Sequence, residues 1–189
     1  MSPHVLASPL DLVVSPEGEE AEDRAGFSFL YEHHAPRIHR FLRDLLGDPA
    51  LAWDATQETF ARAYRNHRVL LRDRSRAAPW LFGVARNVSL EMRKARYRTS
   101  KVMTFGPAER ACDRPSPEGE LLGREAARVV TKALEKLSEE RRAMLLLRLD
   151  HDLSYEDIAE LMGFSLAKVK VEIHRARAIL RETLEAYRR

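Results

Sequence analysis

The sequence predicts an all-α protein with two small helical domains joined by a flexible linker, the second domain carrying a helix-turn-helix. Helix-forming Leu, Ala, Arg and Glu dominate the 189 residues, of which 7% are aromatic and 32% charged. Apolar residues recur at helical spacing in several segments, and a proline-containing stretch without such a period separates two groups of them. Near the C-terminus, two short periodic segments flank one glycine, as in a helical hairpin.

Residues 1–26 lack a helical apolar period. They hold several prolines and six acidic residues against one arginine, so we expect a disordered or loosely docked tail. No basic stretch precedes the apolar residues here, and Asp11 interrupts the run LASPLDLVV, which argues against a secretory signal. No apolar run approaches the ~20 residues that a bilayer requires. We therefore expect a cytoplasmic protein without membrane insertion.

Three helices are expected in the first domain, residues 27–98. The first covers residues 27–46 and stops at the sequence Gly47-Asp48-Pro49. The second covers residues 49–66, and the third begins at Pro79, which suits the first turn of a helix. Between the second and third helices, residues 67–78 are rich in arginine and poor in apolar residues, and we expect a loop there.

The charge of the chain is concentrated in its middle. The formal net charge is only +3, but residues 62–101 hold twelve Lys and Arg against two acids. A long basic helix that carries an asparagine, next to an arginine-rich loop, suits strand-separated or groove-bound nucleic acid. The residues expected to contact DNA here are Arg72, Arg74, Arg76, Trp80, Arg86, Asn87 and Arg93.

Residues 99–120 contain three prolines and two glycines without a sustained period, and we expect a linker there. The second domain, residues 121–189, is expected to begin with helices over residues 121–137 and 138–149. These two helices would pack beneath the helix-turn-helix.

The helix-turn-helix is predicted from Leu153 to Leu180. Ser154 with Asp157 three residues later forms a capping box, and Gly163 stands where a helix ends in a left-handed residue. In the second helix, capped by Ser165, one apolar stripe faces inward and a basic surface faces outward. The residues expected at or near DNA are Lys168, Lys170, Val171, Glu172, His174 and Arg175. An ordinary amphipathic hairpin with solvated charges is the alternative interpretation.

Other function classes find little support in the residues. The single cysteine, Cys112, excludes a disulfide framework and a thiolate metal cluster. His33, His34 and His39 share a helix, but no carboxylate or cysteine lies at ligand spacing on the same face, so we expect no metal there. No glycine-rich phosphate loop and no nucleophile motif is present, and we expect neither a cofactor nor enzymatic activity.

Three motifs resemble those of one protein family. WDATQETFARAYRN (residues 53–66) resembles the D-x-x-Q-E-x-F motif of bacterial RNA polymerase sigma factors, and PWLFGVARNVSLEMRKARYR (residues 79–98) is similar to their W-L-x-x-I-A-R-N helix. Residues 153–180 look like the fourth-region pattern L-S-Y-E-E-I-A-x-x-x-G. Their order, together with two domains and a short linker, resembles the small extracytoplasmic-function (ECF) group of the sigma-70 family.

This resemblance implies a non-enzymatic specificity subunit that binds core RNA polymerase and recognises and opens a promoter. The first domain, region 2 of the family, would dock on the beta-prime clamp helices through Asp54, Gln57, Glu58 and Phe60. Its third helix and the preceding loop would engage the minus-ten element, with Asn87 offering a donor and an acceptor to an unstacked base. The second domain, region 4, would bind the minus-thirty-five element and the beta flap. An anti-sigma factor is a further possible partner.

The chain departs from the family pattern at two places. Leu51 and Trp53 stand where the second-helix motif usually has acids. In the last helix, Lys168, Val171 and Glu172 replace the Thr, Ser and Arg of the usual T-V-K-S-R. Glu172 would either repel the DNA backbone or read a cytosine amino group, unless it pairs with a neighbouring cation.

A stand-alone helix-turn-helix regulator is the alternative function. It would account for Leu153 to Leu180 but would leave the basic first domain unexplained.

Overall fold

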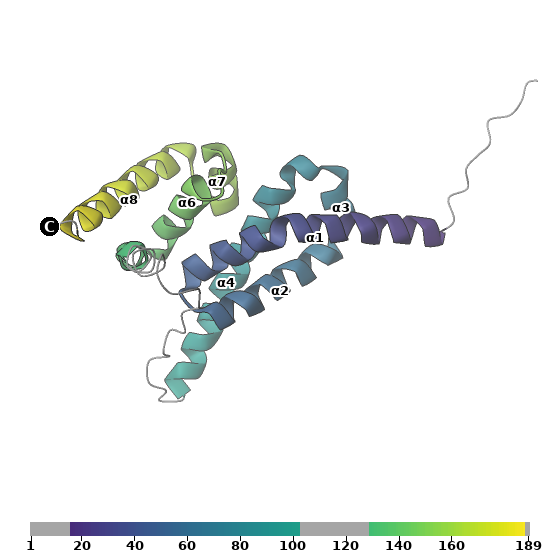
Figure 1. Ribbon diagram of the computed structural model, residues 1–189, viewed down its shortest axis with the longest axis horizontal. Coiled ribbons are helices and arrows are strands. Elements are labelled where there is room, and N and C mark those ends of the chain that lie inside the picture. The colour runs from purple at the N-terminus through teal and green to yellow at the C-terminus, as the bar shows by residue number, and fades with distance from the viewer. Residues whose placement is uncertain (1–15, 103–128, 188–189) are drawn as a thin grey trace, which may run out of the picture.

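The computed structural model describes residues 16–102 and 129–187. In the described part the chain is helical, without strands. The helices are α1 (Pro16–Leu46), α2 (Pro49–Arg65), α3 (His67–Arg72), the 3-10 turn η1 (Arg74–Arg76), α4 (Ala77–Val102), α6 (Glu139–Leu149), α7 (Tyr155–Met162) and α8 (Leu166–Tyr187), with a helical segment at residues 129–135. Figure 1 shows α1 to α4 on one side and α6 to α8 on the other.

The helix ends follow local capping rules. Asp48 caps α2 by accepting a hydrogen bond from the backbone N–H of Leu51 at 3.1 Å, and Pro49 occupies the first turn. Ser154 caps α7 by accepting from the N–H of Asp157 at 2.9 Å. Gly163 ends α7 with φ 67°, a left-handed conformation that glycine adopts without strain. The turn of the helix-turn-helix is therefore confirmed.

The expected tail boundary at residue 26 is wrong, because α1 begins eleven residues earlier, at Pro16. Two contacts hold this acidic extension. Asp23 accepts from the guanidinium of Arg68 at 2.9 Å and lies 3.3 Å from a ring nitrogen of His67. At Gly26 a Cβ would lie 3.0 Å from the side chain of Leu71, so the missing side chain lets α3 approach α1. Residues 1–15 of the expected tail lie outside the described residues.

The arginine-rich segment is not the loop expected over residues 67–78. Its sequence forms α3 and η1, because Leu70 is buried against the first domain and Asp73 caps the turn through the N–H of Ser75. The start expected for the linker is also wrong, since α4 continues to Val102. The rest of the expected linker, and the beginning of the helix expected at 121–137, lie largely outside the described residues.

The two halves share one continuous core. Phe41 and Leu45 of α1 and Phe82 of α4 belong to the same buried cluster as Met144 of α6 and Ile158 of α7. Burying apolar side chains of this size is worth roughly 1.5–3 kcal/mol each. The two predicted domains are therefore packed against each other and not merely linked.

His151, 3% exposed, stands at the centre of this junction. Its ring lies 5.8 Å from Phe41 and 4.7 Å from Phe82, centroid to centroid, and its carbonyl accepts a hydrogen bond from Arg37 at 2.7 Å. Burial lowers the pKa of His151 to about 4; the carboxylate of Asp150 opposes this shift, and Arg37 and Arg40 of α1 add to it. The imidazole is therefore neutral at physiological pH.

Candidate functional site

A hollow of about 460 Å³ lies between α2 and α4. Trp80 and Asn87, which the sequence assigned to one DNA-contacting group, both line it, and the Asn87 side chain is exposed. Cavities of this size hold small organic groups. The full lining is Arg62, Arg65, Asn66, Trp80, Val84, Asn87, Leu90, Glu91 and Lys94.

Arg62 anchors the wall of the hollow. Its Nε donates to Glu58 at 2.7 Å, while its two terminal nitrogens donate to the carboxylate of Glu91 at 3.1 and 2.7 Å. The hydrogen bonds that Arg62 donates to Glu91, and then to Glu58, raise the pKa of Arg62, and Arg62 in turn lowers the pKa of Glu91. This bidentate pair joins α2 to α4 and fixes the shape of the hollow.

The three arginines of the arginine-rich segment that the sequence assigned to DNA are all exposed, but they have different neighbours. Arg74 has its guanidinium carbon 5.7 Å from the ring centre of Phe29. Arg76 donates to both oxygens of Glu160 in α7, at 2.6 and 2.7 Å. Arg72 follows the buried Leu70 and the half-buried Leu71 at the end of α3.

The two remaining cations assigned to this DNA surface are not equivalent. Arg93 in α4 pairs with Glu139 of α6 at 2.7 Å. Arg86 is half-buried, and its carbonyl accepts a hydrogen bond from Ser89. Together with Arg76, Arg93 therefore meets a carboxylate of the second domain where the sequence led us to expect phosphate.

The outer face of α2 carries two of the four residues implied by the resemblance as polymerase contacts. Asp54 and Gln57 are exposed and lie on one face. Glu58 is 37% exposed but already pairs with Arg62. Phe60 is wrong as a surface contact: it is 4% exposed and packs against the ring of Tyr31 at 4.7 Å.

The outer face of α8 is strongly basic. Its inner stripe, Val169, Ile173 and Ala176, is buried as expected. Lys168 lies with its Nζ 3.3 Å from the ring centre of Phe164, and Lys170 lies 5.9 Å from that of Tyr155. The exposed residues of this helix include Lys168, Lys170, Val171, His174, Arg175, Arg177 and Arg181.

Glu172 belongs to the packing of the second domain. Its side chain is 15% exposed, with one oxygen 2.5 Å from Nε of Arg141 in α6 and the other 2.9 Å from Arg175. Hydrogen bonding from Arg141 lowers its pKa, so the carboxylate is charged. Of the alternatives left open by the sequence, the structure shows pairing with a neighbouring cation, Arg175, and the other oxygen faces Arg141 of α6.

Several residues of these surfaces escaped the sequence analysis. The α2 side of the hollow, Arg62, Arg65 and Asn66, was missed because it faces α4, which lies next to it only in the folded chain. Arg177 was also missed, although its spacing from Lys170 places it on the exposed side of α8. The positive charge of Arg177 and its position on the exposed side of α8 were enough to predict a DNA contact from the sequence.

A helix-turn-helix with a basic outer helix, joined to a domain with a basic hollow, defines a DNA-binding transcription protein. Two family models match the chain: sigma-70 region 2 over residues 30–99 and sigma-70 region 4 over residues 127–180. The chain is 33% identical over 169 residues to the ECF RNA polymerase sigma factor SigL of Mycobacterium tuberculosis H37Rv, covering 89% of this chain and 94% of SigL. It is 30% identical to the ECF sigma factor SigM of Bacillus subtilis over 155 residues, covering 80% and 91% of the two chains.

Two solved structures of sigma factors resemble the fold of this chain. Sigma factor RpoE in complex with the anti-sigma factor NepR from Bartonella quintana superposes with a TM-score of 0.72 at 26% identity, covering 84% of this chain and 96% of RpoE. CnrH in complex with the cytosolic domain of CnrY gives a TM-score of 0.59 at 25% identity, covering 88% and 94%. The chain belongs to the ECF group of the sigma-70 family, and it is an alternative sigma factor that directs transcription initiation.

As a sigma factor, the chain has RNA polymerase core and promoter DNA as its partners. Matches in both halves disfavour a stand-alone helix-turn-helix regulator. In the part of the chain that the structure describes, no helix has an apolar stretch long enough to cross a membrane.

Proposed function

We propose that this sigma factor opens its promoter by holding an unstacked base of the minus-ten element in the hollow between α2 and α4. The hollow itself carries the proposal, because it combines the aromatic side chain of Trp80, the donor and acceptor of the Asn87 amide and a basic rim. A flipped base needs a stacking surface and hydrogen-bonding groups for its edge. Arg72 and Arg74 are available on the surface for the phosphates of the separated strand.

The polymerase contact is assigned to the outer face of α2, where Asp54 and Gln57 would meet the beta-prime clamp helices. Glu58 contributes indirectly, because it holds Arg62. Phe60 has no part in this surface.

Upstream DNA is assigned to α8. Lys168, Lys170, Val171, His174 and Arg175 would face the major groove of the minus-thirty-five element, where cations and hydrogen-bond donors read base edges. Arg177 adds a phosphate contact on the same helix. Glu172 acts by fixing Arg175 and not by touching DNA, and the beta flap would contact another part of this domain.

We propose three further aspects, which the family membership supports. The protein acts in the cytoplasm beside RNA polymerase, and it performs no covalent chemistry itself. Because RpoE is seen in complex with the anti-sigma factor NepR, we propose that an anti-sigma factor binds this protein too.

The test is promoter opening by holoenzyme assembled from purified core and the full chain. Asn87→Ala should reduce permanganate reactivity of unpaired thymines while core binding stays unchanged. Asp54→Lys should instead weaken binding to core polymerase, because it reverses the charge at the proposed contact. Asp54 is exposed, so the replacement leaves the hydrophobic core of the domain intact. Wild-type promoter opening by both variants would contradict the proposal.

A further inference from the structure

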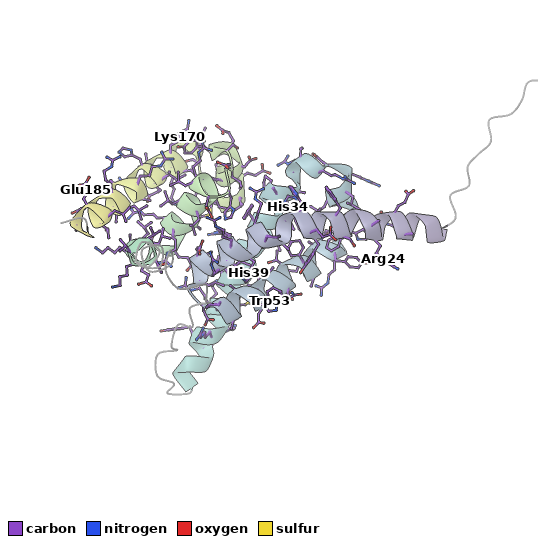
Figure 2. The ribbon with its side chains drawn as sticks, viewed as in Figure 1. Arg24, His34, His39, Trp53, Lys170 and Glu185 are labelled. Carbon is purple, nitrogen blue, oxygen red and sulfur yellow. The ribbon has the colours of Figure 1, made fainter. Side chains whose placement is uncertain are left out.

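An exposed tryptophan stands on the outer face of α2. The side chain of Trp53 is 54% exposed, an unusual situation for the largest apolar side chain. Figure 2 shows Trp53 beside His39 of α1, on the side of the molecule away from Lys170 of α8. Trp53 therefore lies apart from the surface assigned to upstream DNA.

The indole is supported by an oriented imidazole. The rings of Trp53 and His39 meet edge to face, with centroids 5.7 Å apart. The hydroxyl of Thr56 donates its proton to the carbonyl of Ala52 at 2.7 Å, so toward Nδ1 of His39, at 3.4 Å, its oxygen can only accept. Nδ1 of His39 therefore carries the hydrogen, and α2 itself orients the ring on which Trp53 rests.

We propose that Trp53 is the apolar anchor of the contact with RNA polymerase core, an inference that rests on the proposed function of α2. Asp54 and Gln57 follow Trp53 by one and four residues, so the three share an exposed face. An aromatic centre with a polar and acidic rim is the composition of a binding hot spot. This face of α2 fits a basic helical surface of core polymerase that offers a small apolar depression.

The supported ring adds a reason for tight binding. An aromatic side chain that is already held in place loses little conformational freedom when a partner covers it. At this position the chain thus replaces charge attraction with apolar burial. The contact should then be less sensitive to salt than one made by carboxylates alone.

The experiment measures the affinity of core polymerase for the full chain labelled at its single cysteine, Cys112. Trp53→Ala should weaken binding about tenfold, the usual effect of truncating an anchor. Phe29→Ala is the matched control, because Phe29 is 59% exposed on α1 and lies beside Arg74. It should leave core affinity unchanged, and Trp53→Phe should recover part of the loss.

Trp53→Glu separates apolar anchoring from charge. If the contact were electrostatic, a carboxylate beside Asp54 would strengthen core binding, and that result would overturn the proposal. Apolar anchoring predicts a loss at least as large as that of Trp53→Ala. Circular dichroism should show unchanged helicity in every variant.

Asp54→Lys shows which hypothesis fails. A loss with Asp54→Lys but none with Trp53→Ala overturns the anchor and leaves the docking face of α2 in place. If neither change weakens core binding, both the anchor and the docking face are wrong. A loss with Trp53→Ala alone supports the anchor and removes the acidic rim from the contact.

Discussion

The carboxylate of Glu172 in α8 lies 2.5 Å from Nε of Arg141 in α6. This ion pair crosses the second domain and ties the outermost helix to the one beneath it. The other carboxylate oxygen of Glu172 accepts from Arg175, so one largely buried carboxylate both fastens α8 and positions a DNA-facing cation. A residue that looks unfavourable for DNA binding in sequence is thus a structural residue.

Glu172→Arg should lower the thermal midpoint of unfolding, because it places a third guanidinium beside Arg141 and Arg175. Glu172→Gln should cost less, since its amide oxygen can still accept a hydrogen bond. The pKa of Glu172 is lowered in the folded protein, so the stabilisation is present at neutral pH and is lost as the pH falls below the ordinary value of 4.5. Thermal unfolding followed by circular dichroism measures both effects. Tighter upstream binding by Glu172→Arg without any loss of stability would contradict this role.

Asn87→Ala should reduce open-complex formation more than it reduces binding to duplex DNA. The amide is exposed and lines the hollow that we assign to an unstacked base. Potassium permanganate footprinting reports melting, and gel shifts on duplex report binding. Equal losses in both measurements would indicate that Asn87 contacts the duplex instead.

Replacing Arg72 and Arg74 with Ala should reduce the magnitude of the slope of log binding constant against log salt by roughly 0.7 units for each phosphate of the single strand that the variant no longer binds. Both side chains are exposed on the arginine-rich segment. Fluorescence anisotropy on single-stranded minus-ten DNA across a salt series provides the slope. An unchanged slope would mean that these arginines remain solvated in the complex.

Glu160→Gln should strengthen binding to the same single-stranded DNA. Glu160 occupies the guanidinium of Arg76 with both of its oxygens, and DNA has to displace it before Arg76 can contact a phosphate. Glu156→Gln is a suitable control, since Glu156 is also exposed on α7. If Glu160→Gln binds the single-stranded DNA no more tightly than Glu156→Gln does, the pair between Glu160 and Arg76 does not compete with DNA.

His151→Phe should reduce the loss of stability on acidification. The pKa of His151 is about 4 in the folded protein and 6.5 ordinarily, so between these values only the unfolded chain takes up the proton. The wild type thus loses stability as the pH falls from about 6.5 to 4. Urea unfolding at pH 4.5 should show that the variant avoids up to about 2 kcal/mol of this loss.

At pH 7.5 the imidazole is neutral in both states, so the same two proteins should differ there only by their packing. Phenylalanine suits the site between Phe41 and Phe82, and the backbone carbonyl that binds Arg37 remains. Parallel curves for the two proteins across the whole pH range would exclude a contribution from His151.

Local signals in the sequence were sufficient for much of this architecture. Ser138, Ser154 and Gly163 mark helix ends through hydrogen bonds and backbone angles that involve only near neighbours. The stripe Val169, Ile173 and Ala176 likewise depends on one helix period. These features can therefore be predicted without knowledge of the tertiary structure.

The sequence-based predictions that were wrong mostly share a different cause, which is contact between distant parts of the chain. The extension of α1 before residue 27 carries the contact of Asp23 with Arg68, and the carboxylates opposite Arg76 and Arg93 come from the other domain. Such partners are far apart in sequence, and a single sequence does not show which of many charges will meet. Phe60 was misplaced for a simpler reason, since an apolar residue inside a motif was taken for a contact.

The shared core has a thermodynamic consequence. Regions 2 and 4 are separate modules in sequence, yet Phe41, Phe82 and His151 interlock across their junction, and Arg142 of α6 donates to the carbonyl of Leu45 at 3.2 Å. Melting either module alone would leave these apolar faces in water. Calorimetry should therefore record one cooperative transition with equal calorimetric and van't Hoff enthalpies, as for a protein of one domain.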